Sequence, residues 1–325
     1  MNLGLRLSLV ACLAAVLFLG WRWVAASEAP GVPDTQGPNA AAQARRWQSS
    51  QDCKECHGQQ YDEWYGSHHQ IAYTNPEVRR LSDNFRIKDC QACHLPRPVA
   101  VTGIGKRTLP RQTRPLEGVG CLACHLGADG AILAKQSNAE APCRPRADAA
   151  FASVELCASC HNQHQTTDQW RASSYAKEKV SCNECHMPEG SHVFPGAHDP
   201  VMLRKAAEFA LDVAGTSLRM TLRNTGAGHN FPTEERHRAV DVEYSFALAD
   251  GTTTEWKRAF RFRQPYRDEP GENTQLPASA EKILTAEIPA GAAKAQARVW
   301  YRLNPYATDD DPASTLLFER EVAVR

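Results

Sequence analysis

Five short segments with one spacing decide the fold of this 325-residue chain. In each segment two residues separate a pair of cysteines, and a histidine follows the second cysteine. The segments are Cys53-Lys-Glu-Cys56-His57, Cys90-Gln-Ala-Cys93-His94, Cys121-Leu-Ala-Cys124-His125, Cys157-Ala-Ser-Cys160-His161 and Cys182-Asn-Glu-Cys185-His186. C-x-x-C-H is the attachment signal of c-type haem, in which both thiols become thioethers and the histidine binds the iron. The sequence therefore predicts five covalently attached haem c groups, each with a proximal histidine.

Three other interpretations of paired cysteines fit less well. A zinc ribbon does not require a histidine after each pair, and a disulfide scaffold would not repeat one spacing five times. A thioredoxin-like C-x-x-C would occur once, beside a βαβ pattern. The two cysteines outside the motifs are Cys12, in an apolar N-terminal run, and Cys143, which has no C-x-x-C partner. Cys143 is interpreted as a buried or reducible thiol, with a haem contact or an intermolecular bridge as the alternatives.

The N-terminal residues 1–27 are typical of an export segment. Arg6 precedes an apolar run from Leu7 to Gly20, and small residues around Ala26 resemble a cleavage site. An uncleaved membrane anchor with Trp21 and Trp23 at the interface is the alternative, and a lipoprotein signal at Cys12 is a weaker one. Residues 28–50, which are rich in Ala, Pro, Gly and Gln, predict a linker. We therefore expect an exported protein on the periplasmic or outward-facing side of a bacterial membrane, with possible attachment through its N-terminus.

The composition limits the classes of protein that need to be considered. Hydrophobic residues make up 42% and charged residues 23%, which is ordinary for a folded soluble protein. Lys and Arg together equal Asp and Glu at 37 each, so no excess of positive charge indicates a nucleic-acid partner. The expected partners are other redox proteins or cytochromes.

The chain divides near residue 200. Residues 51–200 hold all five motifs in too little chain to surround five porphyrins with a conventional apolar core, so short helices and long loops are expected there. Beyond this point apolar and polar residues alternate, as in 218–223, 239–246, 260–263 and 297–302, and Ala249-Asp250-Gly251 resembles a hairpin turn. The prediction is an α+β multidomain chain. A loop-rich, mainly α-helical multihaem domain at 51–200 precedes a β-sandwich-like domain at 201–325.

A weak internal repeat runs through the motif-bearing part. Trp64-x-x-Ser67-x-His69 follows the first motif, and Trp170-x-x-Ser173-x-Tyr175 follows the fourth. The shared Trp and Ser indicate a duplicated packing unit, and the exchange of His69 for Tyr175 indicates different ligation in the two copies.

Seven histidines remain to complete the irons, and methionines are few. The predicted distal ligands are His69, His164, His192, His198 and His229, whereas His68 and His237 are interpreted as surface histidines. His69 ends the repeat unit, His192 and His198 share a loop that closes the motif-bearing part, and turn-forming residues flank His229. Bis-His ligation would give mainly low-potential haems, because the thioether that raises cytochrome c potentials is missing.

Two groups of basic residues have open interpretations. The first is expected either to bind haem propionates or to be a solvated loop; its members are Arg97, Lys106, Arg107, Arg111 and Arg114. The second is expected to form the wet face of a sheet, or else to dock an acidic partner; its members are Lys257, Arg258, Arg261, Arg263 and Arg267.

The residues around the motifs resemble a known family. The first motif with Tyr61, Trp64 and Ser67, the segment Gly118–His125 and the segment Cys182–Pro188 are similar to multihaem c-type cytochromes related to the tetrahaem cytochrome of ammonia oxidisers. The segment Gly228–Thr233 is similar to one in β-domains attached to some multihaem cytochromes, although Glu234 stands where Gly often follows. The resemblance implies exported electron transfer between closely packed haems. Some relatives leave one haem without a sixth ligand and carry out chemistry there.

Three hypotheses about function follow. The first is a pentahaem electron carrier. The second is a reductase or oxidase of small nitrogen or sulfur species at one five-coordinate haem, although all five motifs end in His where nitrite reductases of this kind carry Lys in the catalytic motif. In the third, the β-domain is a binding module that docks the cytochrome to a partner or to copies of itself.

Overall fold

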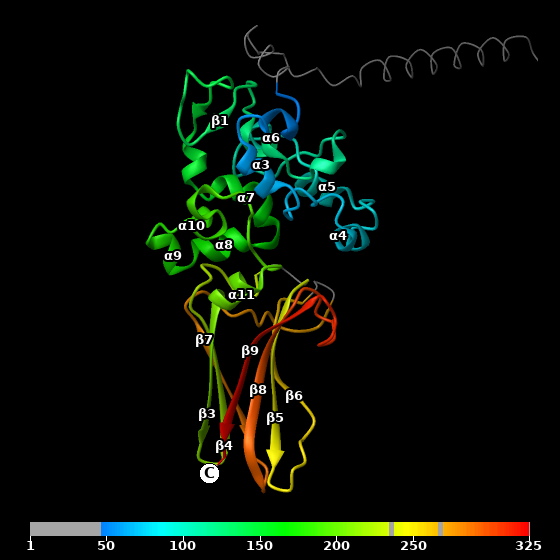
Figure 1. Cartoon of the computed structure of the whole chain (residues 1–325), viewed down its shortest axis with the longest axis vertical. Coiled ribbons are helices and arrows are strands. Elements are labelled where there is room, and N and C mark those ends of the chain that lie inside the picture. Colours follow the sequence, from blue (N-terminus) through cyan, green and yellow to red (C-terminus); the bar gives the residue numbers. More distant parts are fainter. Residues whose placement is uncertain (1–46, 234–236, 266–268, 325) are drawn as a thin grey trace, which may run out of the picture.

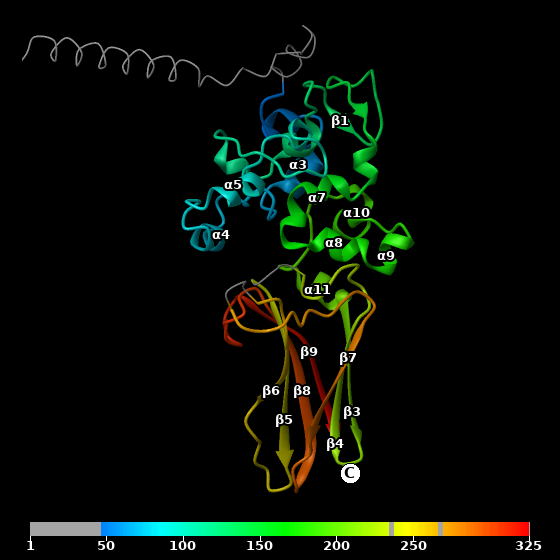
Figure 2. The ribbon, with the colours of Figure 1, turned by 180° about the vertical axis from the view of Figure 1, so that it is seen from behind.

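The structure, a computed structural model, describes residues 47–233, 237–265 and 269–324. Its two parts follow one another along the long axis of the molecule (Figure 1 and, from behind, Figure 2). We name residues 47–199 the motif region and residues 200–324 the strand region. The predicted export segment, 1–27, and most of the predicted linker lie outside the described residues, as do Glu234 and Arg267. Within the described ranges, no helix is long and apolar enough to span a membrane.

The motif region consists of short helices, 3-10 turns and loops. Its elements are η1 (Ser50–Cys53), α3 (Gly58–Trp64), α4 (Pro76–Leu81), α5 (Lys88–His94), η2 (Val99–Val101), η3 (Pro115–Glu117), α6 (Cys121–His125), β1 (Leu133–Ala134), β2 (Arg146–Ala147), η4 (Ala149–Ala152), α7 (Glu155–His161), η5 (Asn162–His164), α8 (Thr166–Arg171), α9 (Ser174–Lys177), α10 (Cys182–His186) and η6 (Pro188–Gly190). None of these helices exceeds seven residues, so tertiary contacts must hold them, because isolated helices this short are unstable in water.

Four of the five motifs form a short helix whose last residue is the motif histidine. These helices are α5, α6, α7 and α10. Residues three apart lie on one face of a helix, so the two cysteines of each motif point to the same side. The first motif differs, because it spans the end of η1 and a turn, and His57 lies at the N-cap position of α3.

The strand region contains two antiparallel sheets. Their strands are β3 (Ala207–Ala214), β4 (Ser217–Asn224), β5 (Ala239–Leu248), β6 (Lys257–Phe262), β7 (Glu281–Glu287), β8 (Ala292–Arg302) and β9 (Ser314–Ala323). The three-stranded sheet has the order β3-β4-β7, and the four-stranded sheet has the order β6-β5-β8-β9. The four segments with predicted period-2 alternation overlap four of these strands, in order β4, β5, β6 and β8. Gly251 has a φ of 87° in the turn after β5, where a hairpin was expected.

One apolar cluster lies between the two sheets. Leu218, Met220 and Leu222 of β4 are 0% exposed, and so are Val242 of β5 and Val299 of β8. Every second residue of these strands faces the cluster, as pleated strands require. All of the fully buried members of the cluster lie between Leu203 and Leu317, so the strand region supplies its own core.

A helix without a following linker joins the regions. Helix α11 (Pro200–Ala206) begins at Asp199, whose carboxylate accepts hydrogen bonds from the amides of Val201 and Met202 at 2.8 and 3.1 Å. Leu203 enters the strand-region cluster, and the next residue after the helix, Ala207, already begins β3. The helix therefore packs as part of the strand region.

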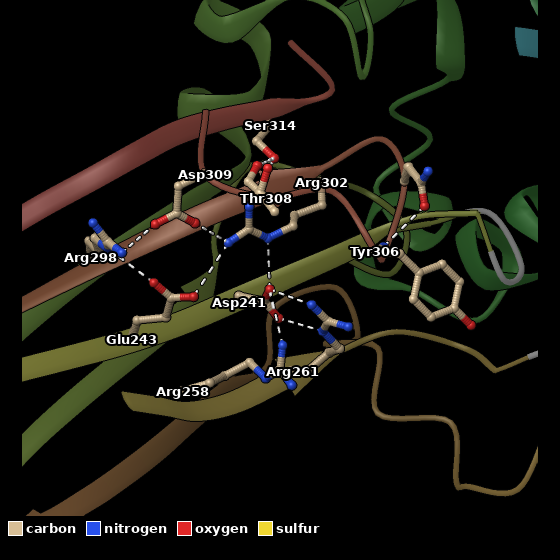
Figure 3. Close-up of polar contacts among 11 residues, drawn as sticks. Asp241, Glu243, Arg258, Arg261, Arg298, Arg302, Tyr306, Thr308, Asp309 and Ser314 are labelled. Carbon is tan, nitrogen blue, oxygen red and sulfur yellow. Dashed lines mark hydrogen bonds and ion pairs between the residues drawn. The ribbon is translucent and has the colours of Figure 1, made fainter. Parts of the chain in front are cut away.

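Three arginines of the predicted basic stripe are ion-paired, Arg258 and Arg261 with Asp241 (Figure 3) and Arg263 with Glu269. Asp241, which is 0% exposed, accepts from Arg261 Nε at 2.6 Å and from Arg302 Nε at 2.8 Å, and Arg258 lies 3.7 Å away. The guanidinium of Arg263 donates to both carboxylate oxygens of Glu269 at 2.8 Å. The expected wet face holds for Lys257 and Arg258, which are exposed, but not for Arg261 and Arg263, which are largely covered.

Candidate haem-binding sites

Three motif histidines are held in one tautomer. The Nδ1 atom of His94 lies 3.0 Å from the Ala72 carbonyl oxygen, that of His125 lies 2.8 Å from Leu133 O, and that of His186 lies 2.7 Å from Pro195 O. A carbonyl oxygen can only accept a hydrogen bond, so each Nδ1 must carry the hydrogen. Each Nε2 then presents a lone pair, which is the form in which histidine binds a metal.

Two histidines from outside the motifs are held in the same way and face motif histidines. His192 Nδ1 lies 2.9 Å from Gly190 O, and His229 Nδ1 lies 2.9 Å from Asn230 O. The ring centres of His125 and His192 are 6.4 Å apart, with planes inclined by 28°. Those of His186 and His229 are 6.3 Å apart and inclined by 15°.

This spacing fits a metal ion bound between two imidazoles. If two imidazole nitrogens bind one iron from opposite sides at about 2 Å each, as in other His–metal bonds, the ring centres lie roughly 6 Å apart. Both measured pairs meet this value, and all four rings keep Nδ1 on a backbone carbonyl. The donor set therefore suits a haem iron with two axial histidines.

A third pair joins His69 and His161, whose ring centres are 6.1 Å apart at an angle of 55°. The peptide of His69 is fixed, because its carbonyl oxygen accepts from Val119 N at 2.8 Å. The ring of Phe194 packs edge-on against His69 at 4.2 Å and lies 5.7 Å from His192. Burial lowers the pKa of His69 to about 3 and that of His161 to about 4, so both rings are neutral at pH 7.

The other predicted ligands are placed differently. His198 stacks on His68 with ring centres 3.7 Å apart, which leaves no room for a porphyrin between them. Burial, with the charges of His68 and Arg238, lowers the pKa of His198 to about 4. His164 lies in η5, three residues beyond His161, and its charge acts on that ring. The roles of His164 and His198 as distal ligands stay predictions.

Cysteines of different motifs touch one another. The side chain of Cys53 lies against that of Cys121, Cys93 lies against Cys160, and Cys157 lies against Cys182. These contacts place the first motif beside the third, the second beside the fourth, and the fourth beside the fifth. In the part of the chain that the structure describes, no group of three or more His, Cys, Asp or Glu is arranged to hold a metal ion, which is what a structural zinc site needs.

The repeat seen in the sequence has a structural counterpart. Trp64 Nε1 donates to Val119 O and Trp170 Nε1 donates to Val180 O, each at 2.9 Å. Val119 and Val180 each stand two residues before a motif cysteine. Each indole therefore connects the motif before it to a later one: the first to the third in one copy, and the fourth to the fifth in the other.

The two copies differ at their last position, as the exchange of histidine for tyrosine suggested. His69 faces His161, whereas the Tyr175 hydroxyl donates to the Thr225 carbonyl of the strand region at 3.1 Å. In this copy the histidine that faces the fifth motif comes from the strand region, and it is His229.

The basic loop between the second and third motifs is partly structural. Arg111 is 8% exposed and donates to the carbonyl oxygens of Thr113, Pro96 and Arg114 at 2.7–3.1 Å. Arg107 pairs with Asp89, and Arg114 bonds to Gln48 O. Arg97 and Lys106 are exposed. The guanidinium of Arg111 thus organises the loop.

Several residues that position the histidines were not found from the sequence. Glu63 accepts from the His192 amide at 2.7 Å, and Asn224 Nδ2 donates to the His229 carbonyl at 2.8 Å. Phe194, with a φ of 54°, is the third. The one local signal in the sequence was the Pro195-Gly196 pair that directly follows Phe194, since Pro-Gly marks a turn. Glu63 gave no such signal, because it lies 129 residues from His192.

Comparison with known proteins agrees with this chemistry. Residues 52–126 match the model of the family described as cytochrome c554 and c-prime. No curated protein matches the chain. The chain shares its fold with a penta-heme cytochrome c552 from Thermochromatium tepidum, with a TM-score of 0.66 and 19% identity over 86% of this chain and 100% of that one.

Two further solved structures are less similar. A superoxide reductase in the oxidised state has a TM-score of 0.20 at 9% identity, covering 37% of this chain and 88% of its own. A superoxide reductase from Nanoarchaeum equitans has a TM-score of 0.21 at 13% identity, covering 38% and 94%. Scores this low carry no argument about fold or function. The family match covers the first three C-x-x-C-H motifs, and the likeness to the penta-heme cytochrome c552 is one of fold.

Proposed function

We propose that the protein is an exported pentahaem c-type cytochrome that relays electrons between redox partners. The observation that carries the proposal is the set of three facing imidazole pairs, with ring centres 6.1–6.4 Å apart. When bound, the haems supply reversible one-electron chemistry. The chain anchors them through cysteines and orients the axial histidines, and burial keeps the rings of His69, His161 and His229 neutral at pH 7.

The proposed axial pairs are His161 with His69, His125 with His192, and His186 with His229. Backbone carbonyls fix Nδ1 in both members of the last two pairs, which favours bis-His ligation and a low potential. His57 and His94 are the proposed proximal ligands of the first two haems, and His164 and His198 remain candidates for their distal ligands.

The contacts between motif cysteines support an order for the relay. Cys53 touches Cys121, and Cys157 touches Cys182. Phe194 packs against His69, which faces the fourth-motif histidine, and also lies 5.7 Å from His192, which faces the third-motif histidine, so the third motif lies near the fourth. We infer a path from the first haem through the third and fourth to the fifth, with the second haem beside the fourth through Cys93.

The proposal extends to the organisation of the chain. Residues 51–200 would form the haem domain and residues 201–325 a β-sandwich domain that covers the fifth haem. The N-terminal 27 residues would direct export, either as a cleaved signal or as an anchor that holds the protein at the membrane. Its partners would be other cytochromes or redox proteins, because the path ends at haems rather than at a substrate pocket.

Intact mass combined with a pyridine haemochrome assay tests the haem count. Five covalent haems per chain are expected, and a smaller number would refute the central claim. Electron paramagnetic resonance (EPR) of the oxidised protein tests the ligation. We expect low-spin signals for at least the three haems with facing histidines.

The same spectra separate electron transfer from catalysis. Spectra that do not change on addition of nitrite, hydroxylamine or cyanide would support the relay. A high-spin signal that one of these molecules alters would instead support a reductase or oxidase at a five-coordinate haem.

A further inference from the structure

The loop of residues 225–229 lies at the boundary between the two regions and carries His229. Its strand-region side is closed by Asn224, which is 1% exposed. The Asn224 amide nitrogen donates to the carbonyls of His229 and Leu276 at 2.8 and 3.2 Å, and its side-chain oxygen accepts from Ala227 N at 3.1 Å. Every hydrogen-bonding position of this amide group except one lone pair is thus used to shape the loop.

The other side of the loop rests on Tyr175 in α9. Figures 1 and 2 show α8 and α9 at the end of the motif region that faces the strand region. The Tyr175 hydroxyl donates to Thr225 O at 3.1 Å. Its ring lies so close to Gly228 that a Cβ added there would stand 3.0–3.2 Å from the ring carbon Cγ, the ring carbon Cδ1 and the Cβ of Tyr175. A glycine at 228 therefore permits this approach.

We propose that Tyr175 is a positioning residue, which clamps the loop of residues 225–229 so that His229 stays opposite His186. The inference rests on the proposed function, since it assumes that His229 binds the iron of the fifth haem. It adds that ligation of this haem depends on docking of the strand region against the motif region.

The sequence repeat explains why a tyrosine stands here. In the first copy the last residue of the unit, His69, itself faces a motif histidine. In the second copy the equivalent residue holds a loop that brings a histidine from the strand region. Both copies of the unit would therefore lie beside a haem, but in the second copy the imidazole comes from His229 of the strand region.

Polar side chains near Tyr175 also hold the motif region against the strand region, and they do so through hydrogen bonds that do not involve Tyr175. Gln169 Oε1 accepts from Thr233 Oγ1 at 2.8 Å and from Asn230 N at 3.3 Å. Thr166 and Thr233 share a hydrogen bond of 2.8 Å across the boundary. Loss of Tyr175 should therefore loosen the loop without separating the regions, which makes the prediction specific to one haem.

The first experiment compares Tyr175→Ala with His229→Ala in the full holoprotein, by EPR and optical spectroscopy of the oxidised state. His229→Ala should convert one haem from low to high spin. Tyr175→Ala should produce the same high-spin species in part of the molecules. Tyr175→Phe, which keeps the ring and loses one hydrogen bond, should shift the ratio of bound to unbound His229 by about 2- to 10-fold. Tyr65→Ala, at a tyrosine 64% exposed, is the matched control and should leave the spectrum unchanged.

A second variant approaches the contact from the other side. Gly228→Ala places a methyl group against the Tyr175 ring and should also produce the high-spin species. Combining Gly228→Ala with Tyr175→Ala removes the clash, so the double variant should show less than the sum of the two single effects. This arm keeps the inference testable if Tyr175→Ala fails to assemble with five haems.

The outcomes distinguish a failure of the proposed ligation by His229 from a failure of the proposed role of Tyr175. If His229→Ala produces no high-spin haem, the proposed ligation fails and the role of Tyr175 fails with it. If His229→Ala does so while Tyr175→Ala and Gly228→Ala both leave every haem low-spin, the ligation stands and the clamp is refuted. Additive effects in the double variant would also refute the direct contact.

Discussion

In the strand region, side chains from two sheets meet in a single apolar cluster, whereas the buried apolar side chains of the motif region lie outside that cluster. Leu218, Val242 and Val299 belong to the cluster, and all are 0% exposed. Trp64 and Leu122 are buried in the motif region, but neither belongs to that cluster. The contrast teaches that the two regions draw stability from different sources: apolar burial in one, and proposed haem packing around the motif helices in the other.

The largest expected effect follows from withholding haem. If the chain is produced without haem attachment, the motif region should lose its structure and the strand region should keep it. Hydrogen exchange followed by mass spectrometry would show fast exchange in α7 and α10 and continued protection in β5 and β8. Protection of α7 and α10 in the haem-free chain would overturn the comparison.

The next effect concerns the buried carboxylate in the strand region. Asp241→Ala removes a partner of Arg261 and Arg302 and should lower the free energy of unfolding by about 1.5–3 kcal/mol, because Arg261 loses its carboxylate whereas Arg302 keeps Asp309 and Glu243. Asp212→Ala, which breaks an exposed pair with Arg219, is the matched control and should cost about 0.2–1 kcal/mol. Denaturant unfolding, followed by hydrogen exchange in peptides from the strand region, measures the free energy of unfolding of both variants. Equal losses would show that the buried network does not stabilise the region.

The same carboxylate makes the stability of the strand region depend on pH. Burial opposes the ionisation of Asp241, but hydrogen bonds and charges from Arg261, Arg302 and Arg258 outweigh it and hold its pKa below 3.8. A group whose pKa is lower in the folded than in the unfolded state stabilises the fold at pH values above its unfolded-state pKa. This contribution is lost as the pH falls through its folded-state pKa. The stability difference between wild type and Asp241→Asn should therefore shrink as pH falls below about 4. A difference that stays constant down to the acid unfolding limit would contradict the assignment.

The smallest effect tests the repeat within the motif region. Trp64→Phe and Trp170→Phe each leave one carbonyl, at Val119 or Val180, without its indole donor, at a cost of about 0.5–1.5 kcal/mol. Trp64→Phe should weaken exchange protection in α6, and Trp170→Phe should do so in α10. Effects that do not follow this pairing would mean that the two copies share sequence but not structure.

Local sequence was sufficient for much of the fold. The shortage of chain around five motifs predicted short helices and long loops, alternation predicted β4, β5 and β8, and the C-x-x-C-H spacing supplied the proposed haem anchors. The first motif, which spans a turn, shows that the spacing fixes the chemistry but not the helix.

The distal half of the site depends on contacts that no local pattern contains. His192 and His229 face histidines 67 and 43 positions earlier in the chain (192 − 125 and 229 − 186). His198 was equally plausible in sequence, yet it stacks on His68. The basic stripe depends on a neighbouring strand in the same way: Asp241 takes Arg261 as its hydrogen-bond partner, whereas Arg258 stays exposed.

The direct passage from α11 into β3 has a consequence for a ligand supplied by the strand region. The amide of Gly226 donates to the Ala206 carbonyl at 3.1 Å, and a side chain at Gly226 would collide with Lys205 O, so the end of α11 also supports the loop that carries His229. A flexible tether would dilute this histidine over the volume that the tether allows. A helix that continues straight into a strand instead keeps its effective concentration high, and little entropy remains to be lost when the imidazole meets the iron.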